Sequence, residues 1–223
     1  MGSWDLVIFD CDGVLVDSEP VGNRVFTEML NEIGLATTLE RTMHDFVGRS
    51  MASCLAIVAE RLGRPVPDDF ASTLEARTFA CFRDELHAVP GVEAALDALD
   101  AAGVPTCVAS SGSHDKMRFT LGLTGLLPRF DGRLFSATEV ARGKPHPDLF
   151  LHAAHTMGAD PAHCAVVEDS PVGARAGVAA GMTVFGFAAR TDPELLARSG
   201  AVPFDDMRRL PDLLCGTTPR TRI

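Results

Sequence analysis

The chain has no long hydrophobic run, little positive charge and no closely spaced cysteines. No apolar stretch approaches the roughly 20 residues that a membrane-spanning helix needs, and the N-terminus lacks the basic and apolar regions of a signal peptide. Lysine and arginine total 20 against 30 acidic residues, so the formal net charge is −10 and binding of nucleic acid or anionic membranes is not expected. The 6 cysteines show no CxxC spacing, which argues against a zinc site or a disulfide framework. We therefore predict a cytoplasmic globular protein that binds neither nucleic acid nor membranes.

The second half of the chain alternates between short apolar segments and amphipathic segments. With 223 residues and 46% hydrophobic content, the chain can form one large domain or two smaller ones. This alternation predicts an α/β fold, in which a doubly wound parallel sheet carries helices on both faces. We expect helices at 92–102, 114–123, 147–157 and 173–180, and strands at 104–109, 134–136, 165–167 and 183–187.

The segment between Ser18 and Ala88 has no strand pattern. Apolar residues such as Phe26 and Leu30 share one face of an expected helix, which Gly34 ends. We predict that residues 18–88 form an inserted helical block, whereas residues 1–17 and 89–223 form the unit that contains the sheet. The alternative is that these helices pack on the sheet as part of a single domain.

The most informative segment is Asp10-Cys11-Asp12-Gly13, which directly follows the apolar residues 6–9. Open α/β sheets bind their ligands at the carboxyl ends of such buried strands. Two carboxylates held close together require a nearby cation, and a nucleophile beside a proton donor suits phosphoryl transfer through an aspartyl-phosphate. The alternatives are a solvated turn and a nucleophilic role for Cys11, whose side chain is expected to point away from both carboxylates.

Three later segments carry polar side chains in a matching order. Residues 106–112 form an apolar run ending in hydroxyls, residues 143–148 contain Lys144 before an expected helix, and residues 165–170 form another apolar run ending in carboxylates. Together with residues 9–18, these segments resemble the four signatures of the haloacid dehalogenase-like (HAD) hydrolases. Within this family, the chain resembles the helical-cap subclass that includes β-phosphoglucomutase and sugar-phosphate phosphatases. This resemblance implies that residues 18–88 are the cap domain and that residues 1–17 and 89–223 are the catalytic core.

The resemblance implies catalytic roles for three residues. Asp10 corresponds to the family nucleophile, and Asp12 corresponds to the general acid/base that protonates the leaving alkoxide and then activates water. The dehalogenases of the family lack this second acid, so the resemblance is to its phosphatases. Lys144 corresponds to the cation that offsets the negative charge of the nucleophile and the phosphate.

The same resemblance implies a magnesium site. Its expected ligands are Asp10, Asp12 through its main-chain carbonyl, and Asp169, with Glu168 as a second candidate. Mg²⁺ prefers oxygen ligands and retains water molecules, so this set would suffice together with the phosphate. The alternative for Glu168 and Asp169 is that they cap the following helix.

The remaining implied contacts are with the substrate. Ser110 corresponds to the phosphate-binding hydroxyl, aided by the main-chain N–H groups of Ser111 and Gly112. Arg49, in the expected cap, is the leading candidate for contact with a substrate phosphate or carboxylate. We therefore predict a Mg²⁺-dependent phosphatase that acts on a small phosphate ester, a sugar or sugar-acid phosphate, as a monomer or small homo-oligomer.

Two other functions fit parts of the pattern. A β-phosphoglucomutase shares all four signatures, but it carries a cap histidine where this chain has Gly22 and a cap arginine where this chain has Met51. A phospho-accepting receiver module also uses an acidic cluster and a lysine, but its phosphorylated residue lies on a middle strand and it has no inserted helical block. The sequence therefore favours hydrolysis, with the mutase as the alternative.

Overall fold

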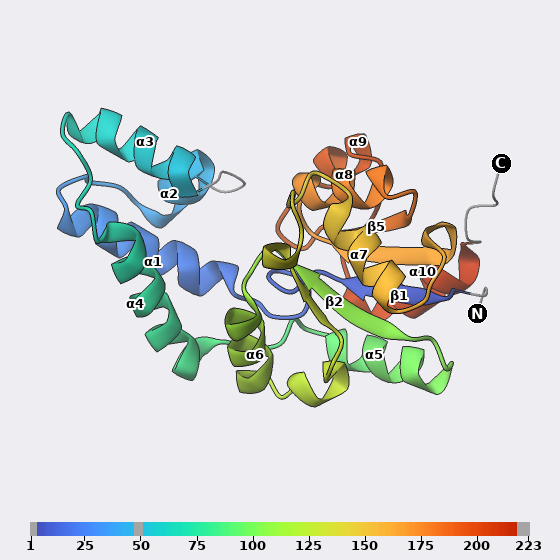
Figure 1. The fold of residues 1–223 in the computed structure, drawn as a ribbon. Coiled ribbons are helices and arrows are strands. Elements are labelled where there is room, and N and C mark those ends of the chain that lie inside the picture. Colours follow the sequence, from blue (N-terminus) through green and yellow to red (C-terminus); the bar gives the residue numbers. More distant parts are fainter. Residues whose placement is uncertain (1–3, 47–50, 218–223) are drawn as a thin grey trace. The chain divides into compact units, whose positions relative to one another are not determined.

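The computed structural model describes residues 4–46 and 51–217 (Figure 1). These residues form two compact units, one containing the chain up to Asp17 and from His87 onward, the other spanning Ser18–Leu86. None of the helices in the described ranges is long and apolar enough to cross a membrane.

The first unit is built on a parallel sheet of 6 strands in the order β3-β2-β1-β4-β5-β6. The central strand β1 lies between β2 and β4, and each of its residues is buried because both faces of the sheet are covered. This architecture confirms the predicted α/β fold. The strands are β1 (Leu6–Phe9), β2 (Thr106–Ser110), β3 (Leu134–Ser136), β4 (Cys164–Glu168), β5 (Thr183–Phe187) and β6 (Val202–Phe204).

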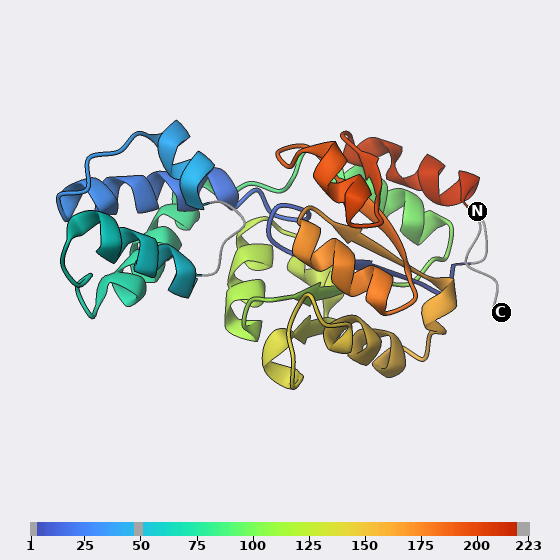
Figure 2. The same cartoon turned by 90° about the horizontal axis from the view of Figure 1, so that it is seen from above.

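Helices cover both faces of this sheet (Figure 2). On one face, Ile8 and Val166 share an apolar core with side chains of α7, α8 and α9. On the other face, the indole N–H of Trp4 donates to the carbonyl of Leu214 in α10, which packs beside α5. The helices are α5 (Val92–Ala101), α6 (His114–Leu123), α7 (Asp148–Thr156), α8 (Pro171–Ala179), α9 (Pro193–Arg198) and α10 (Leu210–Gly216), with 3₁₀ turns η1 (Leu127–Phe130), η2 (Ala137–Glu139), η3 (Pro161–His163) and η4 (Met207–Arg209).

The sequence pattern predicted the strands and α-helices of this unit to within a few residues as far as Phe187, but it did not predict the 3₁₀ turns or the elements after that residue. Strand β6 pairs with β5 at the edge of the described sheet. It is only 3 residues long and contains Pro203, and proline is tolerated at sheet edges where a missing N–H costs no ladder hydrogen bond. A strand this short has no readable alternation, so only pairing with β5 defines it.

The second unit is entirely helical in its described residues. The ring of Phe26 packs edge-on against the rings of Phe46 and Phe70, which join three of its helices into one small core. The helices are α1 (Glu19–Glu32), α2 (Leu39–Phe46), α3 (Met51–Leu62) and α4 (Phe70–Glu85), of which α2 was not expected from the sequence.

Candidate active site

Asp10 lies at the carboxyl end of the central strand. Its N–H donates to the carbonyl of Val167 at 2.9 Å, which continues the pairing of β1 with β4 by one residue beyond Phe9. Because parallel strands end at the same edge of the sheet, Asp10 is brought beside Glu168, the last residue of β4. The sheet therefore places two carboxylates together although they are far apart in the chain.

Lys144 lies between these two carboxylates. Its ammonium donates to Asp10 Oδ1 at 2.8 Å and to Glu168 Oε1 at 2.7 Å. Only 5% of the Lys144 side chain is exposed, and the ammonium also lies over the ring of Phe150, 5.0 Å from its centroid. The lysine predicted to offset negative charge thus occupies the position where it can do so.

Burial sets the protonation behaviour of this group. Loss of solvation raises the pKa of Asp10 to about 7, since it outweighs the opposing attraction of the Lys144 ammonium. Burial alone would lower the pKa of Lys144, but the charges of Asp10 and Glu168 more than compensate and hold it above its ordinary value. Lys144 therefore remains a cation near neutral pH, whereas burial favours the protonated form of Asp10.

The backbone around Glu168 fixes the orientation of its carboxylate. Oε2 accepts hydrogen bonds from the N–H of Ser170 at 2.7 Å and from its hydroxyl at 2.8 Å. The first turn of α8 approaches so closely that a Cβ at Gly173 would lie 1.7 Å from Glu168 Oε1. Glu168 is thus held between Lys144, Ser170 and a glycine that leaves it room.

Three carboxylates at this edge could hold a metal ion. Asp10, Glu168 and Asp169 each offer an oxygen, and these oxygens lie within 4.8 Å of one another. Gly13 has a φ of +74°, and a Cβ at this position would lie 2.0 Å from Asp169 Oδ2, so the glycine lets the loop after β1 reach this carboxylate. An all-oxygen, acidic donor set suits a hard divalent cation such as Mg²⁺. The residues present therefore fit the predicted metal.

Asp12 has a partner that the sequence analysis missed. The ammonium of Lys116 lies 2.7 Å from Asp12 Oδ2, and both side chains are about one-third exposed. The sequence contained one indication of this contact. Lys116 follows the expected start of a helix, where the helix dipole disfavours positive charge, so a lysine there indicates a role other than stabilising the helix.

The predicted phosphate-binding loop begins where β2 ends. Ser110 is buried, and its Oγ accepts a hydrogen bond from the N–H of Gly112 at 3.1 Å. The hydroxyl of Ser136 in β3 donates to the carbonyl of Gly112 at 2.7 Å, which fixes the loop from its other side. Ser111 is exposed at the turn, and Arg49 lies outside the described residues.

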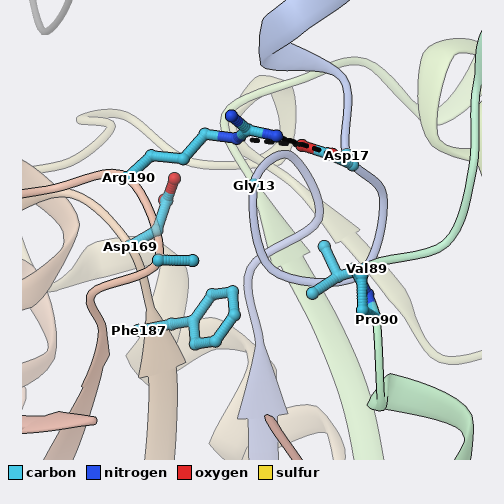
Figure 3. Close-up of a pocket in the computed structure, with 8 residues that line it drawn as sticks. Gly13, Asp17, Val89, Pro90, Asp169, Phe187 and Arg190 are labelled. Carbon is cyan, nitrogen blue, oxygen red and sulfur yellow. Dashed lines mark hydrogen bonds and ion pairs between the residues drawn. The ribbon is translucent and has the colours of Figure 1, made fainter. Parts of the chain in front are cut away.

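Asp169, one of the three metal-capable residues, lines a cavity of about 220 Å³ (Figure 3). Arg190 spans one side of it and pairs with both carboxylate oxygens of Asp17, at 3.0 and 2.8 Å. The side chain of Asp169 points toward this pair, whereas Phe187 and Val89 form the apolar part of the lining. Asp169 thus lines a mainly apolar cavity whose other charged side chains are Asp17 and Arg190.

The surroundings of Cys11 disfavour a nucleophilic role. Its thiol is buried, and its Sγ lies 3.9 Å from the hydroxyl of Thr120 in α6. Burial and the neighbouring carboxylates raise the pKa of the thiol well above its ordinary value, so the thiolate is not populated at neutral pH.

Comparison with known proteins identifies the family. The family model for haloacid dehalogenase-like hydrolases matches residues 4–181. The chain belongs to this family. It is 34% identical to 6-phosphogluconate phosphatase from Escherichia coli (strain K12) over 96% of both chains, and 33% identical to hexitol phosphatase A of the same organism over 83% of both. A haloacid dehalogenase-like protein of unknown function from Agrobacterium tumefaciens has a similar structure, with a TM-score of 0.86 and 32% identity over 96% of this chain and 99% of that one.

These comparisons confirm the predicted family and the predicted class of enzyme. The two E. coli relatives are both phosphatases, and the chain covers most of the length of each. Membership of the HAD hydrolases together with these relatives makes the chain a phosphoric monoester hydrolase.

Proposed function

We propose that this HAD hydrolase cleaves a sugar or sugar-acid phosphate with the help of Mg²⁺, through an aspartyl-phosphate (acyl phosphate) intermediate at Asp10. One observation carries the proposal: the buried Asp10 carboxylate pairs with the Lys144 ammonium and lies beside two further carboxylates, Glu168 and Asp169. A buried nucleophile, a fixed cation and metal ligands are what an aspartyl-phosphate mechanism requires.

In the first half-reaction, an oxygen of Asp10 attacks phosphorus and the bond from phosphorus to the ester oxygen breaks. The proton that the leaving oxygen needs comes from Asp12. Lys144 stabilises the negative charge on the phosphate, and Ser110 with the N–H groups of Ser111 and Gly112 binds its other oxygens. The product alcohol leaves and the phosphate stays on Asp10.

In the second half-reaction, Asp12 takes a proton from water and the water oxygen attacks phosphorus. The bond from phosphorus to the Asp10 oxygen breaks, which releases inorganic phosphate and restores the Asp10 carboxylate. The bound Mg²⁺, held by Asp10, Glu168, Asp169 and the carbonyl of Asp12, would supply a Lewis acid that neutralises charge on the transferring group. Lys144 and Ser170 keep Glu168 oriented for this role.

The substrate class rests on the relatives and on one residue of the cap. The E. coli relatives are named for 6-phosphogluconate and hexitol phosphates, which are phosphorylated derivatives of six-carbon sugars. We assign Arg49 to the carboxylate or distal oxygens of such a substrate, because a guanidinium binds carboxylates in a bidentate manner. Arg49→Gln should raise KM for 6-phosphogluconate more than for a hexitol phosphate, and equal effects on both would contradict this assignment.

A panel of phosphate monoesters assayed for released phosphate tests the proposal. The wild type should be inactive in EDTA and active with Mg²⁺, and Asp10→Asn should abolish turnover because an amide cannot form the acyl-phosphate. Asp131→Asn, at an exposed position of the same unit, is the matched control and should keep wild-type activity. Phosphate release by Asp10→Asn at the wild-type rate would rule out this nucleophile.

The identity of the phosphate acceptor is tested separately. We propose water, because Gly22 and Met51 stand where β-phosphoglucomutases carry the cap histidine and arginine. Incubation with β-glucose 1-phosphate and a trace of the 1,6-bisphosphate should therefore release inorganic phosphate. Efficient formation of glucose 6-phosphate with little free phosphate would establish the mutase alternative.

A further inference from the structure

The ion pair between Lys116 and Asp12 joins two segments that are separated by 104 positions in the chain. The Nζ–Oδ2 distance is 2.7 Å, and the two residues come from the first turn of α6 and from the loop after β1. The nucleophile has its own cation in Lys144, so Lys116 provides a second lysine contact, directed at Asp12.

The loop before α6 is shaped so that Lys116 can reach Asp12. Ser113 caps the helix and accepts a hydrogen bond from the N–H of Lys116 at 3.3 Å, which fixes the start of the side chain. A Cβ at Gly112 would lie 3.2 Å from Lys116 Cδ and 3.4 Å from Ser110 Oγ. Because Gly112 has no side chain, the lysine stem can lie across the loop without crowding Ser110.

Fold stability does not account for this lysine. About 31% of the Lys116 side chain and 30% of the Asp12 side chain are exposed, and ion pairs this accessible to water contribute little to stability. The ammonium also belongs to a residue in the first helical turn, where the helix dipole disfavours positive charge. Lys116 therefore contributes little to stability, yet it contacts the general acid/base. We explain its presence by its effect on Asp12.

We propose that Lys116 is a positioning residue for Asp12, which it holds at the distance where the carboxyl group exchanges a proton with the ester oxygen. This inference rests on the proposed function, in which the phosphorus–ester oxygen bond breaks, the bond from phosphorus to Asp10 forms and the Asp12 proton moves to the leaving oxygen. Lys116 itself gains and loses no proton in this step.

The choice of leaving group distinguishes a positioning role of Lys116 from phosphate binding and from a structural role. An alkoxide leaves only with a proton, so hydrolysis of an alkyl phosphate depends on the placement of Asp12. The p-nitrophenolate ion leaves without a proton. The first step with p-nitrophenyl phosphate therefore depends far less on the placement of Asp12. Since kcat/KM covers the steps up to departure of the leaving group, the loss in kcat/KM should differ between the two substrates.

The experiment compares Lys116→Met, which keeps the aliphatic stem, with wild type on 6-phosphogluconate and on p-nitrophenyl phosphate. If 6-phosphogluconate is not hydrolysed by the wild type, the best alkyl ester of the panel replaces it. We expect kcat/KM for the alkyl ester to fall by about 10- to 100-fold, the range for a misplaced catalytic group, and that for p-nitrophenyl phosphate to fall less than about 3-fold. Lys116→Arg should recover part of the loss, and Arg118→Met on the same helix should match wild type.

Each other outcome is decisive. An equal loss with both substrates would make Lys116 a binder of the phosphate and overturn the inference, as would no loss with either. A changed thermal unfolding midpoint for Lys116→Met, with no recovery by arginine, would assign it a structural role. Failure of the wild type to hydrolyse any ester would instead contradict the proposed function, so the two failures are distinguishable.

Discussion

Lys144 shows how one buried side chain can determine both stability and chemistry. Its ammonium is nearly inaccessible to water and pairs with two carboxylates that are themselves buried. Removing one partner of such a group leaves the others charged without compensation, which costs far more than the loss of a surface ion pair. By contrast, Lys116 pairs with Asp12 where water can replace it.

We therefore predict that Lys144→Met lowers the free energy of unfolding of the metal-free protein by about 3–5 kcal/mol. The matched variant Lys116→Met should lower it by less than about 1 kcal/mol, because that pair is partly exposed. Urea unfolding followed by circular dichroism gives both values. Equal losses for the two variants would show that burial does not decide the contribution of these lysines.

At the scale of elements, the approach of α8 to the sheet depends on small residues. Gly173, Ala174, Ala176 and Gly177 of this helix are buried. A Cβ at Gly177 would lie 2.7 Å from a methyl group of Val184 in β5, and one at Gly173 would overlap the Glu168 carboxylate. The helix can therefore lie directly against the strands that carry the site, with its first turn beside Glu168.

Gly173→Ala should destabilise the protein by about 1–3 kcal/mol, the usual cost of overpacking, because Glu168 is held by Lys144 and Ser170 and has little room to move. The affinity of the Gly173→Ala variant for Mg²⁺ should fall as well, and titration with Mg²⁺ measures this change. The control is Gly22→Ala in α1, where a Cβ would meet no atom within 4 Å. That substitution should stabilise the protein by about 0.5–1 kcal/mol, since alanine favours a helix over glycine. A neutral Gly173→Ala would contradict the close approach.

The whole molecule carries a net charge of −10 and is proposed to bind an anionic substrate. Positive charge at the site must compensate for this net negative charge. Lys144 lies at the carboxyl end of the sheet, and a divalent cation held by Asp10, Glu168 and Asp169 would add to its charge. The metal has to compete with a proton at Asp10, whose pKa is raised to about 7 by burial. We therefore expect metal binding at this site to depend on pH.

The sign of this coupling gives a prediction for stability. The pKa of folded Asp10 lies above its ordinary value of 3.8, so the metal-free folded state binds this proton more tightly than the unfolded state does. Protonation of Asp10 therefore stabilises the metal-free folded state fully below about pH 4, and this stabilisation is lost as the pH rises through about 7. Mg²⁺ should consequently raise the melting temperature little at about pH 5.5 and clearly at about pH 8, where Asp10 is ionised.

Differential scanning fluorimetry in EDTA and in Mg²⁺ at the two pH values measures this effect. In Asp10→Asn the difference between the two pH values should disappear, since the titrating group is gone. An equal Mg²⁺ shift at both pH values in the wild type would contradict proton competition at Asp10.

The sequence by itself determined the features that depend on neighbouring residues. Strand β1 could be predicted because residues 6–9 form a continuous apolar run, and α6 because Ser113 precedes a helical pattern. The order of the four signature segments was enough to predict the family, and Asp10 and Lys144 belong to those segments. Such patterns depend only on neighbouring residues, so they can be recognised without knowledge of the fold.

The tertiary structure alone decided which side chains meet. The pairing of Lys116 with Asp12 and that of Arg190 with Asp17 join positions more than 100 residues apart, and no spacing in the sequence encodes them. Strand β6 likewise exists only because β5 offers a free edge for pairing. Parallel strands bring their carboxyl ends to one edge whatever their separation in the chain, and for that reason the site's contacts depend on the order of strands in the sheet.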